Sequence, residues 1–334
     1  MDITTTLSAL NRAFGPSGDE SGVAEVIAEL ARPYVDEITR DTMGNLICHK
    51  KGPGAKVLFA AHMDSLGLIV THVEEEGYLR FGKIGGVNPQ RILSAPVRFK
   101  NGTRGTVAAN ENADFGKLKL DDLYLDIGVS SAEEARKKVQ LGDVAVYDTA
   151  CLDLGGRIVS PYQDNRISCV VLLMALEGLS ASKNDLYFVF TTQEEVGLRG
   201  AKTAAYAIDP DYGIAVDVTG SGDLPGTKHQ QSSRQGEGAA IKVMDSSVIC
   251  HPSVVNRLRD LAEAKGIPYQ MDIIQSGGTD AGAIHQSRSG IYTGGISIPC
   301  RYIHSPAELV TKSDVTACAE LVRAFAECEL PKLA

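Results

Sequence analysis

Side chains that can bind a metal ion occur at five places in the sequence, each at the end of a strand or in the adjoining loop. These residues are His62 with Asp64, Asp164, Glu194 with Glu195, Asp217, and His304. In open α/β sheets, functional residues gather at the carboxyl ends of strands, so residues distant in sequence can meet there. A mixed set of imidazole and carboxylate ligands suits Zn²⁺, Co²⁺ or Mn²⁺ rather than Mg²⁺ or Ca²⁺. The pattern is consistent with two such ions that share one bridging carboxylate.

His62 and Asp64 directly follow the apolar run 57–61, which predicts a buried strand. Residues two apart in a strand share a face, so the two side chains are expected to lie together. A carboxylate in that position can fix the tautomer of a metal-binding imidazole. A lone histidine at a strand end is usually structural, but the nearby Asp64 favours a ligand role for His62.

Glu194 and Glu195 follow another predicted strand. Two adjacent carboxylates at the end of an apolar strand are costly to bury unless they are paired or bind a metal. One could bind a metal ion while the other faces a substrate, and the alternative is an ordinary solvated loop. Asp164 could simply cap a helix, and Asp217 and His304 carry little information when taken singly.

The elements that must position these residues alternate between strands and helices. Strands are expected over 57–61, 185–192, 212–218, 240–243, 269–274 and 291–298. Helices are expected after a capping box formed by Ser17 and Glu20, over 164–179 and 253–264, and from an N-cap at Ser313. This alternation predicts an α/β fold, a mostly parallel-containing mixed sheet flanked by helices.

Residues 68–153 have a different texture, with short β-rich runs separated by turns. Asn101-Gly102 lies between the runs 97–100 and 103–107, and this pair favours the tight turn of a hairpin. A short helix is expected near Ser131, with Glu134 completing its capping box. We therefore predict a small inserted β domain over 68–153, and a larger domain made of residues 1–67 plus 154–334.

Composition excludes several classes of protein. The chain has 334 residues with 33 basic and 42 acidic side chains, a net charge of −9, which argues against binding nucleic acid. Its longest apolar run, 169–176, has eight residues, whereas a membrane-spanning helix needs about 20. The first twelve residues lack the pattern of a secretory signal. Seven cysteines without a CxxC pair indicate free thiols, so we expect a cytoplasmic protein that contacts no membrane.

Six segments, in the same order along the chain, resemble the dinuclear metallo-aminopeptidases of metallopeptidase family 42. This is the tetrahedral aminopeptidase group, which includes glutamyl aminopeptidases and proteins once described as endoglucanases. The segments are 15–20 (GPSGDE), 61–64 (AHMD), 164–166 (DNR), 192–201 (TQEEVGLRGA), 278–283 (GTDAGA) and 296–306 (ISIPCRYIHSP). Each is moderately specific, and together they are highly specific. The chain departs from the family in having Ser65-Leu66-Gly67 where Glu-Val-Gly is frequent, and Asn165 where Asp is frequent.

The resemblance implies two divalent metal ions per subunit, Zn²⁺ or Co²⁺ with Mn²⁺ as a further candidate. His62 and Asp217 would bind one ion, Glu195 and His304 would bind the other, and Asp164 would bridge them. It also implies a zinc-peptidase-like fold, with a cis peptide bond after Asp164 and a small β-barrel-like inserted domain that forms dimers. Many relatives form dodecamers, so a homo-oligomer is expected.

The implied activity is removal of N-terminal residues from short peptides. Glu194 would be the general base, acting on a hydroxide shared by the two ions, and Asp64 would steer His62. A metallo-carboxypeptidase or deacylase is an alternative, and it would need a cationic clamp for a substrate carboxylate. A glycoside hydrolase using paired carboxylates is a further alternative, but it leaves the histidines without a role. Asp280, in a glycine-rich loop, either supports the site or forms a turn.

Overall fold

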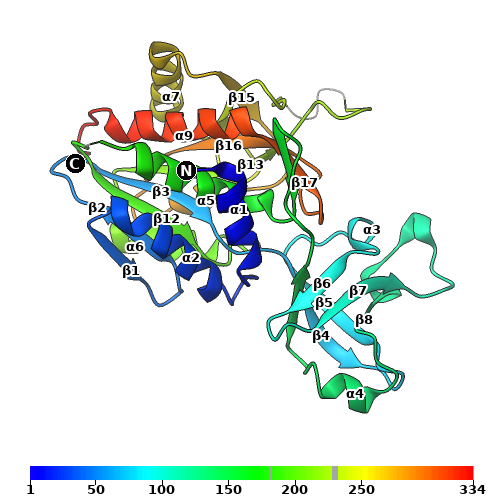
Figure 1. The fold of residues 1–334 in the computed structure, drawn as a ribbon. Coiled ribbons are helices and arrows are strands. Elements are labelled where there is room, and N and C mark those ends of the chain that lie inside the picture. The colour runs from blue at the N-terminus through cyan, green and yellow to red at the C-terminus, as the bar shows by residue number, and fades with distance from the viewer. Residues whose placement is uncertain (181, 228–231, 334) are drawn as a thin grey trace.

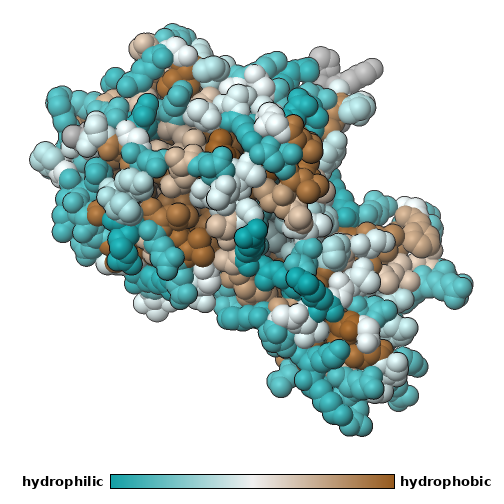
Figure 2. All heavy atoms as spheres, viewed as in Figure 1, coloured by the Kyte–Doolittle hydropathy of each residue, from teal (hydrophilic) through white to brown (hydrophobic). Residues whose placement is uncertain are grey.

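The computed structural model describes residues 1–180, 182–227 and 232–333. The chain forms two lobes, an α/β body and a smaller barrel attached to one side of it (Figure 1). The space-filling view in Figure 2 shows the same two lobes, with a mostly hydrophilic surface broken by scattered apolar patches. None of the helices in the described residues combines the length and apolar character needed to cross a bilayer.

Four parallel strands form the centre of the body. They are β12 (Asp185–Thr191), β3 (Lys56–His62), β13 (Tyr212–Gly220) and β16 (Tyr292–Arg301), in that spatial order. The other strands of this sheet in the described residues are β1 (Glu37–Arg40), β2 (Leu46–Lys50), β10 (Leu152–Asp153), β11 (Arg157–Ser160), β14 (Ala239–Met244), β15 (Tyr269–Ile273) and β17 (Glu308–Thr311). Most of these pair antiparallel, so the predicted mixed sheet is confirmed.

Helices cover both faces of the sheet. One face carries α1 (Ile3–Arg12), α2 (Ser21–Ala31), α5 (Gln163–Gly178), α7 (Pro252–Lys265) and α9 (Lys312–Glu327), and the other carries α6 (Arg199–Ile208) and α8 (Ala281–Ile284). Strand β3 shows why: Val57 and Phe59 belong to the core on one face, and Leu58 and Ala60 to the core on the other. The strand is apolar throughout because both of its faces are buried.

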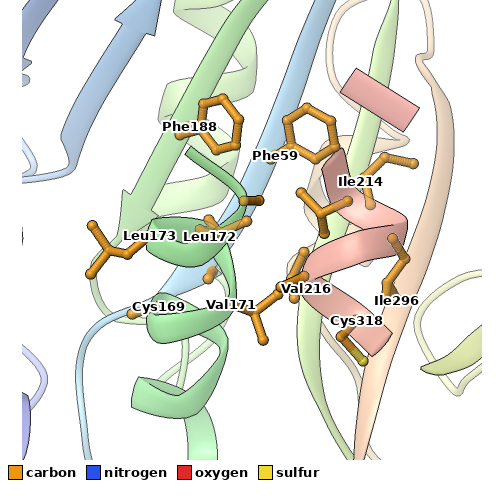
Figure 3. Close-up of a cluster of buried hydrophobic side chains, with 14 of the residues drawn as sticks. Phe59, Cys169, Val171, Leu172, Leu173, Phe188, Ile214, Val216, Ile296 and Cys318 are labelled. Atoms are coloured by element: carbon orange, nitrogen blue, oxygen red, sulfur yellow. The ribbon is translucent and has the colours of Figure 1, made fainter. Parts of the chain in front are cut away.

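The larger core lies between the central strands and helices α5 and α9 (Figure 3). The ring of Phe59 stacks on Phe188 with centroids 5.0 Å apart and meets the edge of Phe325 at 6.2 Å. Cys169 is fully buried in this core, in agreement with its apolar helical setting. This packing fixes the start of α5 and the end of β3, where two of the predicted site residues lie.

Two predicted helix starts are wrong. Helix α2 begins at Ser21, because Ser17 and Glu20 form other hydrogen bonds instead of a capping box. The Ser17 hydroxyl donates to Asp64, and the Glu20 carboxylate accepts from the backbone N–H of Gly18. The last helix begins at Lys312 rather than after Ser313, since strand β17 leads directly into it.

The smaller lobe is a closed barrel with its own apolar core. Its strands are β4 (Gly67–Val73), β5 (Leu79–Ile84), β6 (Pro96–Phe99), β7 (Arg104–Ala109), β8 (Leu123–Asp126) and β9 (Val144–Tyr147). Strands β6 and β7 form the predicted hairpin around Asn101-Gly102, with Gly102 at φ 88°. Two short helices accompany the barrel, α3 (Pro89–Ile92) and α4 (Ala132–Arg136), the latter capped by Ser131 as predicted.

Candidate metal centre

The structure brings the five predicted ligands and Glu194 to one pocket at the carboxyl end of the parallel strands. Strand β3 ends at His62, and Asp217 lies near the end of β13. The first turn of α5 contains Asp164, and Glu194 with Glu195 follows β12. The fifth ligand, His304, lies in the loop between β16 and β17. This convergence is the one expected for an open α/β sheet.

One group of three possible ligands lies inside the sheet. His62 Nε2 is 3.1 Å from Asp164 Oδ1 and 3.9 Å from Asp217 Oδ1. One ligand atom from each residue lies within 4.8 Å of the others, as is needed to hold one ion. We call this group the sheet half-site.

A second group lies at the rim and shares one residue with the first. His304 Nε2 is 3.3 Å from Asp164 Oδ2 and 3.4 Å from Glu195 Oε2. Asp164 therefore turns one oxygen toward each histidine, which is the arrangement that a bridging carboxylate requires. We call the group of Asp164, Glu195 and His304 the loop half-site.

Asp64 ties the sheet half-site to the loop that carries the two glutamates. Its Oδ1 lies 3.4 Å from His62 Nδ1 and accepts from the backbone N–H of Glu194 at 3.0 Å. Its Oδ2 accepts from the Glu195 N–H at 3.3 Å and from the Ser17 hydroxyl at 2.6 Å. Asp64 therefore links the ring of His62 to the backbone of both glutamates.

Three supporting residues were missed by the sequence analysis. Glu20 is buried and accepts from the Gln193 backbone N–H at 3.2 Å, next to the glutamates. Glu308 accepts from the N–H of His304 at 2.7 Å and from that of Asp164 at 2.8 Å. The carbonyl of Gly86, which belongs to the barrel lobe, lies 3.1 Å from His304 Nδ1. The segment 15–20 gave a signal for Glu20, and Glu308 lies only four residues after His304, but nothing in the sequence singled out Gly86.

The site also contains the cis peptide bond between Asp164 and Asn165 that the family resemblance implied. Asp164 and Asn165 have non-helical backbone angles inside the first turn of α5. The Asp164 side chain turns its two oxygens to His62 and His304 and not to the backbone N–H groups of the helix, so it does not act as the N-cap that its position in the sequence allowed.

Burial and crowding dominate the electrostatics of the site. Burial, together with neighbouring carboxylates, raises the pKa of Glu194, Glu195 and Asp217 well above their usual range. Burial opposes the charged form of His62, but Glu194 and the nearby aspartates outweigh it and raise its pKa. Burial also opposes ionisation of Asp164, yet hydrogen bonds from the two histidines hold its pKa below the usual value.

These groups fit a pair of divalent cations. Four carboxylates crowd around two imidazoles, and Glu195 Oε1 is buried with no hydrogen-bond partner among the described residues. Such a cluster is costly to bury unless a cation compensates it, and mixed carboxylate and imidazole ligation suits zinc-like ions. The residues present therefore fit divalent ions of this kind.

Asp280 lies in the buried surroundings of the centre. It is 2% exposed, its Oδ2 accepts from the Thr191 hydroxyl at 2.5 Å, and burial raises its pKa to about 6. Its side chain makes no cap to the helix that follows, and its charge acts on Glu194 and Asp217. Asp280 therefore contributes to the electrostatics of the site rather than to a surface turn.

The pocket wall beyond these charged groups is uncharged and mixes apolar residues with the hydroxyl side chains of Thr219, Ser276 and Thr279. It includes the side chains of Leu198, Val218, Ile274 and Ile303, and the glycine-rich run that contains Gly277 and Gly278. This wall is suited to an uncharged side chain next to the bond that is to be cleaved.

The chain is similar to known aminopeptidases along most of its length. The model of the M42 glutamyl aminopeptidase family matches residues 44–321. A putative aminopeptidase of Acetivibrio thermocellus is 46% identical over 322 residues, covering 96% of this chain and 97% of that protein. The lysyl aminopeptidase of Pyrococcus furiosus is 35% identical over 327 residues, covering 94% of this chain and 93% of that protein.

Solved structures agree with these matches. An aminopeptidase from the archaeon Desulfurococcus kamchatkensis superimposes with a TM-score of 0.94 at 40% identity, covering 97% of this chain and 94% of that one. The TET1 peptidase of Pyrococcus horikoshii, which can assemble into a tetrahedron or a large octahedral shell, has a TM-score of 0.87 at 30% identity, covering 97% and 99%.

Proposed function

The chain belongs to the M42 glutamyl aminopeptidase family and is a peptide hydrolase, and from this premise we propose how it removes N-terminal residues from short peptides. The proposal is a dinuclear metal centre around Asp164 with Glu194 as general base. The observation that carries it is the placement of Asp164, which turns one oxygen to His62 and the other to His304. The two proposed ions are Zn²⁺ or Co²⁺, with Mn²⁺ as a further candidate.

In this proposal each half-site holds one ion. His62 and Asp217 bind the first, Glu195 and His304 bind the second, and Asp164 binds both. When bound, such ions polarise a carbonyl group and lower the pKa of water to about 7. The protein supplies the orientation, because Asp64 fixes His62 while Glu308 fixes the backbone of both His304 and Asp164.

Glu194 is the group that moves the proton. It lines the pocket but belongs to neither half-site, and its Oε2 lies 3.7 Å from His62 Nε2. Burial favours the neutral form of its carboxyl group, which is the form that results when Glu194 has accepted a proton. Glu194 takes a proton from the attacking water and returns it to the leaving amine, while Asp64 holds its backbone N–H.

The experiment compares a short peptide that begins with leucine with its N-acetylated twin. Leucine is chosen because Leu198, Ile274 and Ile303 line the wall of the pocket. We expect stepwise loss of single N-terminal residues from the free peptide and almost none from the capped one. Mass spectrometry identifies the products. Equal cleavage of both, or loss from the carboxyl end, would favour a carboxypeptidase or deacylase. Chelator-independent release of sugars from a glucan would favour a glycoside hydrolase.

We also propose that the protein is a cytoplasmic homo-oligomer built from dimers, up to a dodecamer. The relative from Pyrococcus horikoshii that assembles into shells supports this proposal, and the inserted segment 68–153 is the dimerisation domain in it. All seven cysteines lie within the described residues and none forms a disulfide, as suits a reducing compartment.

A further inference from the structure

We propose that the barrel supports the metal centre. The carbonyl of Gly86 and the side chain of Arg91, both in the barrel lobe, position His304 for the loop half-site. The inference rests on the proposed dinuclear function and adds to it. It assigns two positioning residues to a lobe that contributes no predicted ligand. It also predicts that the contact between the barrel and the body affects metal binding at the loop half-site and not at the sheet half-site.

The first observation is the hydrogen bond between the two lobes at His304. The ring Nδ1 lies 3.1 Å from the Gly86 carbonyl oxygen, which can only accept, so Nδ1 carries the proton. The other ring nitrogen, Nε2, faces Asp164 and Glu195 and is the nitrogen left to bind an ion once its own proton is lost. A carbonyl that fixes the tautomer of an imidazole in this way is a typical support for a metal ligand.

The second observation is how closely the barrel backbone approaches the half-site. A Cβ atom added to Gly86 would lie 2.5 Å from Cε1 and Nδ1 of the His304 ring. A Cβ atom on the preceding Gly85 would lie 3.1 Å from the Cβ of Glu195. Only glycine allows this approach, so the barrel packs against both residues that are specific to the loop half-site.

The third observation concerns the loop that carries His304. Tyr302 and His304 have φ values of 62° and 65°, in the left-handed region that residues with side chains adopt at a cost. Contacts with the rest of the protein offset this cost. Glu308 of β17 accepts from the N–H of His304, and residues of the barrel lobe supply two further contacts. The Arg91 guanidinium donates to the carbonyl of Ile303, and the Thr149 hydroxyl donates to the carbonyl of Pro306 at 2.9 Å.

The sheet half-site has a different support. His62 lies in a strand of the body and is oriented by Asp64, whose other partners are Ser17 and the backbone of the two glutamates. Asp217 is held in β13 between β3 and β16. A displaced barrel would therefore disturb His304 and leave these two residues in place.

The test measures metal binding in Gly86→Ala, with Gly156→Ala as the matched control. Both glycines are exposed, neither has a positive φ, and a Cβ atom on Gly156 meets nothing within 4 Å. Zn²⁺ is titrated into metal-free protein by calorimetry, and retained zinc is counted by elemental analysis. We expect two ions per chain in the wild type and in Gly156→Ala. In Gly86→Ala we expect one ion at wild-type affinity and a second weakened about 10–100-fold, the usual effect of losing an orienting partner.

A second variant keeps the inference testable if Gly86→Ala does not fold. Arg91→Ala should weaken the same ion by a smaller factor and Arg91→Lys should restore part of it, because lysine keeps the charge and one donor. Arg136→Ala, an exposed arginine in α4 at the far end of the barrel, should bind zinc like the wild type (Figure 1).

The possible outcomes separate the two proposals. Wild-type protein that binds only one ion would remove the dinuclear function on which the inference rests. Two ions in the wild type with unchanged binding in folded Gly86→Ala, or equal weakening of both ions, would overturn the role of the barrel alone. If Gly86→Ala does not fold, equal zinc binding by Arg91→Ala and Arg136→Ala would overturn the role of the barrel.

Discussion

The two half-sites share Asp164 but are built in different ways. In the sheet half-site the side chains of His62 and Asp217 are 1% and 8% exposed, and both residues lie in adjacent parallel strands. In the loop half-site the side chain of His304 is 31% exposed and lies in a loop held from the second lobe. The first is therefore positioned by the packing of the core, and the second by a few hydrogen bonds.

This difference implies unequal rigidity. Side chains on packed strands are held more precisely than side chains on loops. Local opening is also easier where few buried apolar contacts oppose it. We therefore expect the loop half-site to lose its ion first, to respond to changes in the barrel, and to regain its ion last.

Metal removal should have the largest effect. A strong chelator should abolish aminopeptidase activity, and Zn²⁺ or Co²⁺ should restore it, because the proposed ions contribute several kcal/mol to catalysis. Under graded chelation, elemental analysis should show one ion leaving well before the other. In Glu195→Gln the early step should be absent, whereas full activity in demetallated protein would contradict the metal centre altogether.

Replacing each of the two adjacent glutamates by glutamine should separate catalysis from metal binding. Glu194→Gln should lower kcat by about 10²–10⁴-fold with both ions retained, because it removes the proton acceptor. Glu195→Gln should lower the occupancy of the loop half-site and leave the sheet half-site filled. Steady-state kinetics and zinc counts on the same preparations check this, and the reverse pattern would exchange the roles of base and ligand.

Removing the support of the sheet half-site should give a smaller effect. Asp64→Asn keeps the shape of the side chain but loses the charge next to His62 Nδ1. We expect the tighter ion to be weakened about 10–100-fold and the loop ion by a smaller factor, because Asp64 also accepts from the backbone N–H of Glu195. Gly86→Ala should instead weaken the loop ion alone. Calorimetric titration of both variants decides this, and loss of the same ion in both would show that the two supports are not independent.

The sheet half-site and the fold were more predictable from sequence than the support of the loop half-site. The apolar strand that ends in His62, and the apolar run that Asp217 interrupts near the end of β13, leave a local pattern, because burial on both faces excludes most polar residues from such strands. The fold class and the hairpin at Asn101-Gly102 were predicted for similar reasons of local chemistry. The roles of the ligands came from the family resemblance and remain predictions.

The remaining features depend on contacts between distant segments. Gly86 lies 218 residues before the histidine that it orients, and a glycine carbonyl leaves no mark in the sequence beyond the glycine itself. Ser17 and Glu20 were misread as a capping box because the same side chains that cap helices also serve loops around a site.

The smallest expected effect is the pH dependence of stabilisation by metal, which involves both half-sites. Burial, with like charges nearby, raises the pKa of Glu195 and Asp217 in the folded protein above their ordinary values of 4.5 and 3.8. A carboxyl group of this kind binds its proton more tightly when the protein is folded. Its contribution to stability is therefore lost as the pH rises through the folded pKa.

His62 acts in the same direction, although for the opposite charge. Burial opposes its charged form, but Glu194 and the aspartates raise its pKa above 6.5, so its contribution is also lost as the pH rises through the folded value. Asp164 has a lowered pKa, and it affects stability only near and below its ordinary value of 3.8. Between pH 5.5 and 8, the metal-free protein should therefore become less stable as the pH rises.

Bound metal ions take the place of these protons and remove the repulsion between the carboxylates. The increase in Tm caused by Zn²⁺ should therefore be larger at pH 8 than at pH 5.5. Thermal unfolding with and without Zn²⁺ at several pH values measures this increase. Asp217→Asn should reduce the pH dependence of this increase, because it removes a carboxyl group with a raised pKa from the sheet half-site. Glu195→Gln should do the same for the loop half-site. An increase in Tm that is the same at both pH values would show that the buried carboxylates are not neutralised in the metal-free protein.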